Sequence, residues 1–221
     1  MTTFLFLRHA HSTANESGIL AGRLEGVSLS KVGKRQARAI NLALKDQRID
    51  RIISSPLVRC RETIETVAKA RRKRIHFDPN FVEMDYGLWS GKKLKELAKE
   101  KSWKTIQKNP SSFTFPKGES FRTAASRVEK RLSFLARKFP NETILIVTHG
   151  DIIKIALQLS HGAPLDNFQR FIVDTCSLSE IHWTGNSRSV VRVNTRLVKT
   201  TILGAVKTQV NRRALGGGSG V

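Results

Sequence analysis

Two histidines and two arginines stand just beyond apolar segments of the chain. Arg8 and His9 directly follow the segment FLFL, and His149 follows ILIVT. Arg59 comes shortly after a third apolar segment, which ends in Ser-Ser-Pro. A neutral imidazole is a competent nucleophile near pH 7, and arginine presents a fixed fork of donors that matches phosphate oxygens. These residue types together favour attack by an imidazole on a bound phosphoryl group.

The shared position of these side chains strengthens that interpretation. A single histidine after a strand is more often a hydrogen-bonded structural residue than a catalytic one. Short apolar runs of this kind are typical of strands buried on both faces, and ligands of open α/β sheets lie beyond the carboxyl ends of such strands. If the strands are parallel neighbours, all four side chains converge on one crevice.

The rest of the chain supplies the elements that such a sheet needs. Strand and helix patterns alternate, which predicts a three-layer α/β/α fold with a mostly parallel central sheet. Ser30 is a plausible helix N-cap, Pro56 is placed to open a helix, and Gly162 to close one. Strands are expected within 4–8, 48–55, 74–77, 142–150, 177–183 and 189–195, and helices within 30–46, 57–73, 92–101, 120–139 and 151–162.

Length and composition restrict the class of protein. The 221 residues fit one α/β domain, and we expect a catalytic domain over 1–199 and a flexible, basic, Gly-rich tail over 200–221. No apolar run approaches the roughly 20 residues that span a bilayer, and nothing marks the N-terminus for secretion, so a cytoplasmic protein is expected. Cys60 and Cys176 are most simply free thiols and form no metal-ligand cluster.

The net charge is unusual. Lys and Arg number 39 against 18 Asp and Glu, which gives +21. Between Lys31 and Arg74 there are 14 basic and 4 acidic residues. Such a surface attracts polyanions and small phosphorylated molecules alike, and non-specific polyanion binding is the simpler interpretation, since no zinc-finger spacing or other nucleic-acid-binding motif is present.

Four ordered motifs resemble those of a known family. LRHAHSTAN, SSPLVRCRET, EMDYGLWSG and VTHGD occur in the order seen in the histidine phosphatase superfamily, in its phosphoglycerate-mutase-like branch. The resemblance covers about residues 3–194. It implies a phosphoglycerate-mutase-like fold and an enzyme that needs no metal or other cofactor.

The resemblance also implies roles for individual residues. His9 matches the histidine that becomes phosphorylated, and Glu83 matches the acid that protonates the leaving oxygen. The expected phosphate pocket and substrate contacts comprise Arg8, Arg59, His149, Asn15 and Arg23. The Glu83 role is chemically reasonable, because a buried protonated carboxyl can assist an alkoxide in leaving and then deprotonate the attacking water.

Some positions depart from the family pattern or allow a simpler interpretation. Ala10 replaces the usual glycine, which is tolerated if its φ is negative. His11 stands where mutases carry an acid, and either lines the pocket or lies on the surface. Asp151 is interpreted as a cap of the helix that follows it.

A mutase must exclude water from its phosphorylated form, and mutases of the family that this chain resembles carry a longer insertion after the Trp89 loop. The corresponding segment here, 92–116, is short, so a phosphatase is favoured over a mutase. The sequence therefore predicts a hydrolase of a small phosphorylated metabolite. The alternatives are a phosphoglycerate-type mutase and a basic polyanion-binding protein that retains the fold.

Overall fold

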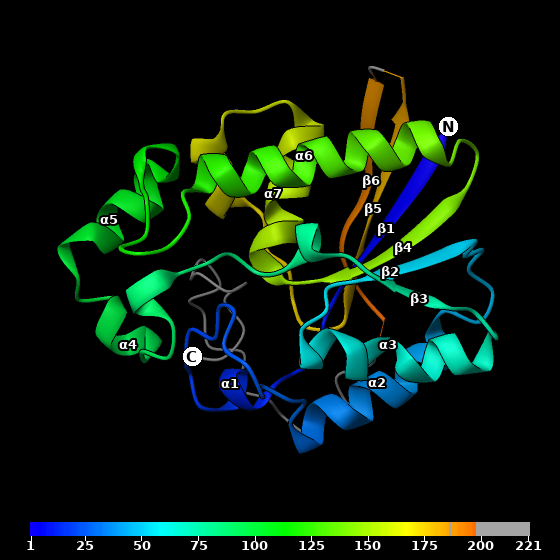
Figure 1. Cartoon of the computed structure of the whole chain (residues 1–221), viewed down its shortest axis with the longest axis horizontal. Helices are drawn as coiled ribbons and strands as arrows, with labels where there is room; N and C mark the ends of the chain where they lie inside the picture. Colours follow the sequence, from blue (N-terminus) through cyan, green and yellow to red (C-terminus); the bar gives the residue numbers. More distant parts are fainter. Residues whose placement is uncertain (186, 198–221) are drawn as a thin grey trace.

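One six-stranded sheet organises the fold in a computed structural model of the chain, which describes residues 1–185 and 187–197 (Figure 1). The spatial order of the strands is β3-β2-β4-β1-β5-β6. β1 pairs in parallel with β4, and β2 with β4 and β3, whereas β5 and β6 add antiparallel. The predicted mostly parallel sheet is confirmed. The strands span Thr2–Arg8 (β1), Arg51–Ser54 (β2), Ile75–Phe77 (β3), Thr143–Thr148 (β4), Ser177–Thr184 (β5) and Ser187–Arg196 (β6).

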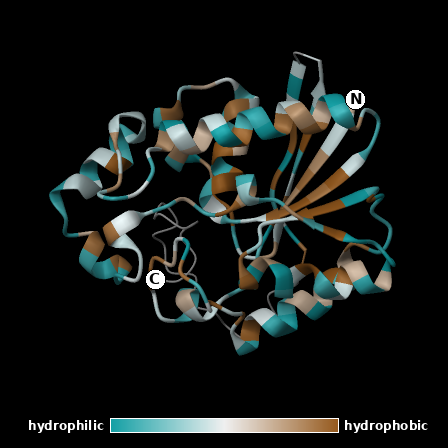
Figure 2. Ribbon diagram, in the orientation of Figure 1, coloured by the Kyte–Doolittle hydropathy of each residue, from teal (hydrophilic) through white to brown (hydrophobic). Residues whose placement is uncertain are grey.

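Helices cover both faces of the sheet, as the alternation of elements predicts. On one face lie α2 (Lys31–Ala43) and α3 (Val58–Ala70), and on the other lie α6 (Phe121–Lys138) and α7 (Gly150–His161) (Figure 1). Successive side chains of a strand point to opposite faces, so Phe4 and Phe6 enter one hydrophobic core while Leu5 and Leu7 enter the other. The central strands β1 and β4 are accordingly hydrophobic over their middle residues, with polar residues at their ends (Figure 2).

The predicted helix over 92–101 is wrong in extent. The chain forms two short helices there, α4 (Leu94–Leu97) and α5 (Lys101–Lys108), separated at Glu100, which has extended backbone angles. The break lets Leu97 and Ile106 both reach the core and lets Trp103 stack on Trp89. Tertiary packing here overrides a continuous run of good helix formers.

The remaining short elements connect these layers. They are α1 (Thr13–Glu16) and the 3₁₀ turns η1 (Pro79–Phe81), η2 (Gly87–Trp89), η3 (Pro110–Ser112) and η4 (Leu165–Arg170).

Two of the three predicted helix boundaries agree with the structure. The Ser30 hydroxyl accepts from the amide of Gly33 at the start of α2, and Gly162 ends α7 with a φ of 73°. Pro56 does not open α3, which begins at Val58 after Leu57 in extended conformation. Ser55 still donates its amide to Val147 of the neighbouring strand, which holds the chain extended up to Pro56.

The predicted tail over 200–221 lies outside the described residues. Within 1–185 and 187–197, no helix combines the length and hydropathy needed to cross a bilayer.

Candidate active site

The carboxyl ends of three parallel strands meet at one edge of the sheet. Arg8, the last residue of β1, is paired in register with Thr148, the last residue of β4. The next residue of the chain continues this alignment, because the His9 amide donates to the Thr148 carbonyl at 2.9 Å. The amide of Ser55, just after β2, donates to Val147 at 2.9 Å. The loops that follow the three strands therefore start side by side, as predicted.

His9 is held in one tautomer. Its Nδ1 lies 2.7 Å from the carbonyl oxygen of Ala10. A carbonyl can only accept, so Nδ1 carries the proton and Nε2 presents a lone pair. Burial, with further contributions from the charges of Arg59 and Arg8, lowers the pKa of His9 well below its ordinary value, which keeps the ring neutral. This arrangement leaves His9 neutral, with a lone pair on Nε2.

His149 lies against His9. The two ring centroids are 5.2 Å apart at an interplanar angle of 61°. His149 is fully buried, and its Nε2 lies 2.8 Å from the hydroxyl oxygen of Ser55 and 3.5 Å from the sulfur of Cys60. Burial, followed by the charge of Arg59, lowers the pKa of His149 well below its ordinary value.

Two buried arginines bring positive charge to the histidines. Arg8 is fully buried and donates to the carbonyl of Val173 at 2.7 Å. Arg59, in the first turn of α3, donates through Nη2 to the carbonyl of Gly22 at 2.8 Å. Its Nη1 is buried and has no hydrogen-bond partner within the described part of the chain. A buried guanidinium with an unused donor is suited to bind an anion.

Gly22 adopts a φ of 51°, and a Cβ at this position would lie 2.9 Å from both the Ser90 hydroxyl and the Tyr86 ring. Both the backbone conformation and the close approach require glycine. The carbonyl that holds Arg59 is thus fixed by local sterics.

Glu83 lies in the loop between β3 and α4 and is buried. Its Oε1 accepts from the amide of Met84 at 3.0 Å. Burial, followed by the negative charge of Asp151, raises the pKa of Glu83 to about 7, against the opposing effects of Arg59 and Arg8. A carboxyl with this pKa can both donate and accept a proton near neutral pH.

Arg23 and Asn15 occupy different settings. Arg23 is half-exposed and donates to the main-chain carbonyl of Glu83 at 3.0 Å and to Glu119 at 3.0 Å. It therefore lies beside the segment that carries Glu83. The carboxamide oxygen of Asn15 accepts from both the amide and the hydroxyl of Ser12, in a capping box at the start of α1. The structure thus fixes the orientation of this side chain.

Sequence reasoning missed several residues that hold the site. Ser55 contacts His149, although sequence reasoning assigned no role to Ser55 itself. Arg127 of α6 donates to the carbonyls of Asn80 at 2.5 Å and Val82 at 2.9 Å, which fixes the chain just before Glu83. No local signal distinguishes Arg127 from other charges on the polar face of an amphipathic helix.

The structure also places the two departures from the family pattern, Ala10 and His11, and the expected helix cap Asp151. The φ of Ala10 is not positive, so its methyl group is tolerated. The Nδ1 of His11 lies 2.9 Å from the hydroxyl oxygen of Ser30, the N-cap of α2, which gives His11 a structural contact. The interpretation of Asp151 as a helix cap is wrong. The N-cap of α7 is His149, and the Asp151 carboxylate instead accepts from the Tyr86 hydroxyl at 2.7 Å.

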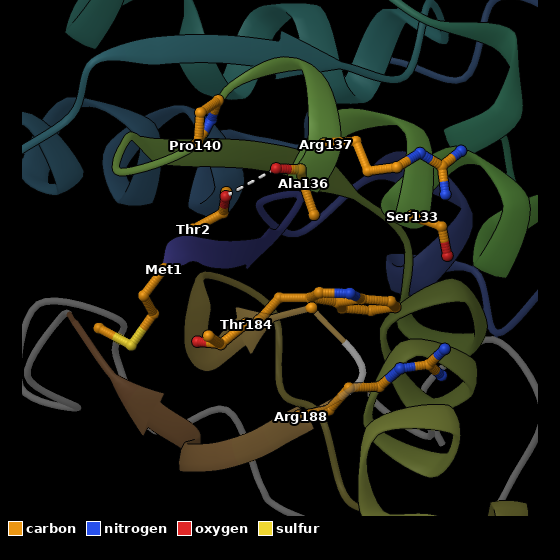
Figure 3. A pocket seen from close by; sticks show the side chains of 10 residues that line it. Met1, Thr2, Ser133, Ala136, Arg137, Pro140, Thr184 and Arg188 are labelled. Carbon is orange, nitrogen blue, oxygen red and sulfur yellow. Dashed lines mark hydrogen bonds between the residues drawn. The ribbon is translucent and has the colours of Figure 1, made fainter.

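A surface pocket of about 580 Å³ lies away from these residues (Figure 3). Thr2, at the start of β1, and Ser133 and Arg137 of α6 line it, at the opposite end of β1 from Arg8. It shares no residue with the site at the strand ends. Within the described ranges, no group of three or more His, Cys, Asp or Glu side chains is arranged to hold a metal ion.

The sequence model of the histidine phosphatase superfamily, branch 1, matches residues 4–196. The chain is 28% identical over 196 residues to phosphoserine phosphatase 1 of Hydrogenobacter thermophilus, covering 88% of this chain and 92% of that protein. It is also 28% identical over 183 residues to a protein of Erwinia tasmaniensis named probable phosphoglycerate mutase GpmB, covering 82% and 85% of the two chains.

Among solved structures, the α-ribazole phosphatase of Shigella flexneri is similar, with a TM-score of 0.78 and 25% identity. The match covers 89% of this chain and 98% of that one. The predicted fold class is confirmed by this similarity.

Proposed function

The chain belongs to branch 1 of the histidine phosphatase superfamily, and on this basis we propose that His9 is the nucleophile of the enzyme. The protein is a phosphomonoester hydrolase that acts on a small phosphorylated metabolite through a phosphohistidine. The observation that carries the assignment to His9 is its tautomer, because the hydrogen bond from Nδ1 to the Ala10 carbonyl directs the free lone pair to Nε2.

In the first step, Nε2 of His9 attacks phosphorus and the bond from phosphorus to the ester oxygen breaks. Arg8, Arg59 and His149 donate to the non-bridging oxygens, and the buried Nη1 of Arg59 is the donor that most clearly lacks another acceptor within the described residues. Donors held in place before the reaction stabilise the charge that develops in the transition state. The carboxyl of Glu83 gives its proton to the departing oxygen.

In the second step, water attacks the phosphorus of the phosphohistidine. The Glu83 carboxylate accepts the proton of that water, the bond between nitrogen and phosphorus breaks, and inorganic phosphate leaves. A single carboxyl serves both steps because its pKa of about 7 makes both protonation states accessible near neutral pH.

We assign Asn15 and Arg23 to substrate binding at the margin of this site. Arg23 contacts the main chain of Glu83, so a substrate group that reaches Arg23 lies next to the proposed acid.

The proposal extends to a single catalytic domain over 1–199, supported by the family match over 4–196. Unpaired Cys60 and Cys176 support the further proposal of a cytoplasmic location, since free thiols are typical of a reducing compartment.

A panel of phosphate esters tests the function. Phosphoserine, α-ribazole phosphate, 3-phosphoglycerate and p-nitrophenyl phosphate are incubated with the protein, and released phosphate is measured. We expect hydrolysis, and from 3-phosphoglycerate no 2-phosphoglycerate. Efficient interconversion of the two phosphoglycerates would favour the mutase alternative. Release of phosphate from none of the esters would contradict the proposal.

A second candidate activity is polyanion binding by a basic surface next to the edge strand β3. A surface cavity of about 520 Å³ there is lined by Lys69, Arg72, Lys73 and Arg74, and by Glu65, which pairs with Lys69 at 2.8 Å. Phe77 also lines it and is 47% exposed. Clustered cations beside an exposed aromatic ring favour a phosphate-rich polymer.

Fluorescence anisotropy with a labelled oligonucleotide tests this candidate. Binding is expected to weaken steeply as salt rises and to weaken further in the Lys69→Ala, Arg72→Ala, Arg74→Ala triple variant, with hydrolysis unchanged. The matched control removes the same number of charges elsewhere, at the exposed Lys95, Lys99 and Lys104 of the α4 and α5 region. Equal affinity in the triple variant and the control would contradict a localised site.

A further inference from the structure

A buried cluster of ionisable side chains lies beneath the loop that carries Glu83. Asp151, Lys154 and Tyr86 are each fully buried. The Tyr86 hydroxyl donates to Oδ2 of Asp151 at 2.7 Å, and Nζ of Lys154 lies 3.6 Å from Oδ1 of Asp151. Nζ of Lys154 also donates to Oε1 of Gln169 at 3.2 Å. Burial of such groups carries a large desolvation cost, which apolar residues of similar volume would avoid.

This cluster joins the two segments that carry the proposed acid and His149. Tyr86 follows Glu83 by three residues in the same loop. Asp151 lies in the first turn of α7, two residues after the N-cap His149. The bond from Tyr86 to Asp151 therefore tethers the Glu83 loop to the start of the helix that presents His149.

Tyr86 also packs close to Gly22, the residue whose carbonyl binds the proposed phosphate-binding Arg59. A Cβ on Gly22 would come within 2.9 Å of the Tyr86 ring, and the carbonyl of Gly22 accepts from Arg59. A shift of Tyr86 would thus displace both the loop that carries Glu83 and Gly22, whose carbonyl binds Arg59. The position of the cluster is consistent with a role in the reaction.

We propose that Asp151 is a positioning residue for the proton of Glu83, and that its negative charge, held in place by Tyr86 and Lys154, keeps the proton on Glu83 until the ester oxygen leaves. This inference rests on the proposed function, in which Glu83 is the general acid. Without a nearby anion, the two buried arginines would favour early ionisation of Glu83.

The charges around Glu83 support this role. Asp151 from α7 raises the pKa of Glu83, while the amide of Met84, Arg59 from α3 and Arg8 from β1 lower it. The positive charge of Lys154 also acts on Glu83 and opposes that of Asp151. Burial acts in the same direction as Asp151, and these two effects prevail, since the resulting pKa is about 7. Tyr86 itself stays neutral, because burial and the adjacent Asp151 raise its pKa well above its ordinary value. Arg23 and Arg127 contact the main-chain carbonyl of Glu83.

The decisive test is Asp151→Asn, which keeps an acceptor for Tyr86 and removes the charge. kcat/KM is measured against pH for phosphoserine and for p-nitrophenyl phosphate. The alkaline limb for phosphoserine, a poor leaving group, is expected to move about one pH unit downward. Nitrophenolate leaves without a proton, so its rate is expected to change by no more than about threefold.

Three further variants separate positioning from stability. Tyr86→Phe retains the charge of Asp151 and loosens the tether, so kcat for phosphoserine is expected to fall while the alkaline limb does not move downward. The matched control, Asp46→Asn, removes an exposed carboxylate and is expected to change neither quantity. If Asp151→Asn fails to fold because Lys154 loses its partner, the double variant Asp151→Asn, Lys154→Met removes the buried pair together. The charge of Lys154, which opposes that of Asp151 at Glu83, is then lost as well, so the alkaline limb is expected to move downward by less than one pH unit.

The role of Asp151 would be overturned if the alkaline limb of the phosphoserine profile stays in place in Asp151→Asn. An equal loss of kcat/KM with both esters would also overturn it. Failure of the wild-type protein to hydrolyse either ester would instead contradict the proposed function. The two failures are therefore distinguishable.

Discussion

The imidazole of His9 lies 5.2 Å, centroid to centroid, from that of His149, although the two residues follow different strands of the sheet. Parallel pairing of β1 with β4 produces this proximity, since the register aligns Arg8 with Thr148 at the strand ends. Both rings are buried among arginines and are held neutral. In the proposed mechanism, one ring attacks phosphorus while the other contacts an oxygen of the same phosphoryl group.

The hydroxyl of Ser55 orients His149 from 2.8 Å, so Ser55→Ala is expected to lower kcat about tenfold to a hundredfold through misplacement of the ring. Steady-state kinetics with phosphoserine measure the effect. Ser54→Ala is a matched control, because Ser54 is an equally buried neighbour whose hydroxyl donates to the Ser55 carbonyl. Equal losses in the two variants would point to a general packing defect.

Arg59→Lys is expected to reduce kcat/KM by about 10²–10³-fold, because an ammonium cannot bind Gly22 and a phosphate oxygen in the geometry of the guanidinium fork. The measurement is initial-rate kinetics with phosphoserine. Arg61→Lys, at an exposed position on the same helix, serves as the control and is expected to retain activity. Near-normal activity of Arg59→Lys would show that Arg59 does not bind the phosphoryl group.

Chelation is expected to leave the rate of hydrolysis unchanged, because Arg8, Arg59 and an imidazole nucleophile supply the positive charge and the attacking group. Released phosphate is measured after dialysis against EDTA, with and without added Mg²⁺. Loss of activity on dialysis and its recovery with Mg²⁺ would contradict the proposed mechanism.

Glu83→Gln is expected to stabilise the fold at alkaline pH while it abolishes general acid catalysis. In the wild type, the pKa of Glu83 is raised to about 7 by burial and Asp151, from an ordinary value of 4.5. Stability from the protonated form is complete below pH 4.5 and is lost as pH rises through 7. Between pH 5 and 8 the free energy of unfolding of the variant should therefore gain about 2–3 kcal/mol relative to the wild type.

Urea unfolding at the two pH values measures that gain. The matched control is Glu65→Gln, which removes an exposed carboxylate paired with Lys69. A difference between Glu83→Gln and wild type that stays constant with pH would show that Glu83 is not buried in its protonated form.

The sheet and its site edge could be predicted because the relevant signals are local. Buried strands such as β1 and β4 appear as apolar runs, and the residues just beyond them fall at one edge in any parallel arrangement. The roles of Glu83, Asn15 and Arg23 came only from the family motifs, since nothing in their local sequence distinguishes a buried acid from a loop contact.

The supporting contacts could not be predicted, because they join segments distant in the chain. The bond from Tyr86 to Asp151 depends on the packing of a loop against α7, and the contacts of Arg127 depend on the docking of α6. The break between α4 and α5 likewise follows from the burial of Leu97 and Ile106. Helix propensity and capping signals carry no information about such contacts.

Rapid quench with a phosphate ester labelled on phosphorus tests the central claim most directly. The protein is mixed with the ester, denatured within milliseconds and digested, and the labelled peptide is sequenced. We expect label on His9, with His11→Ala retaining it and His9→Ala losing it. Label on His149 or another residue, or hydrolysis by a wild-type protein that never carries label, would contradict the account.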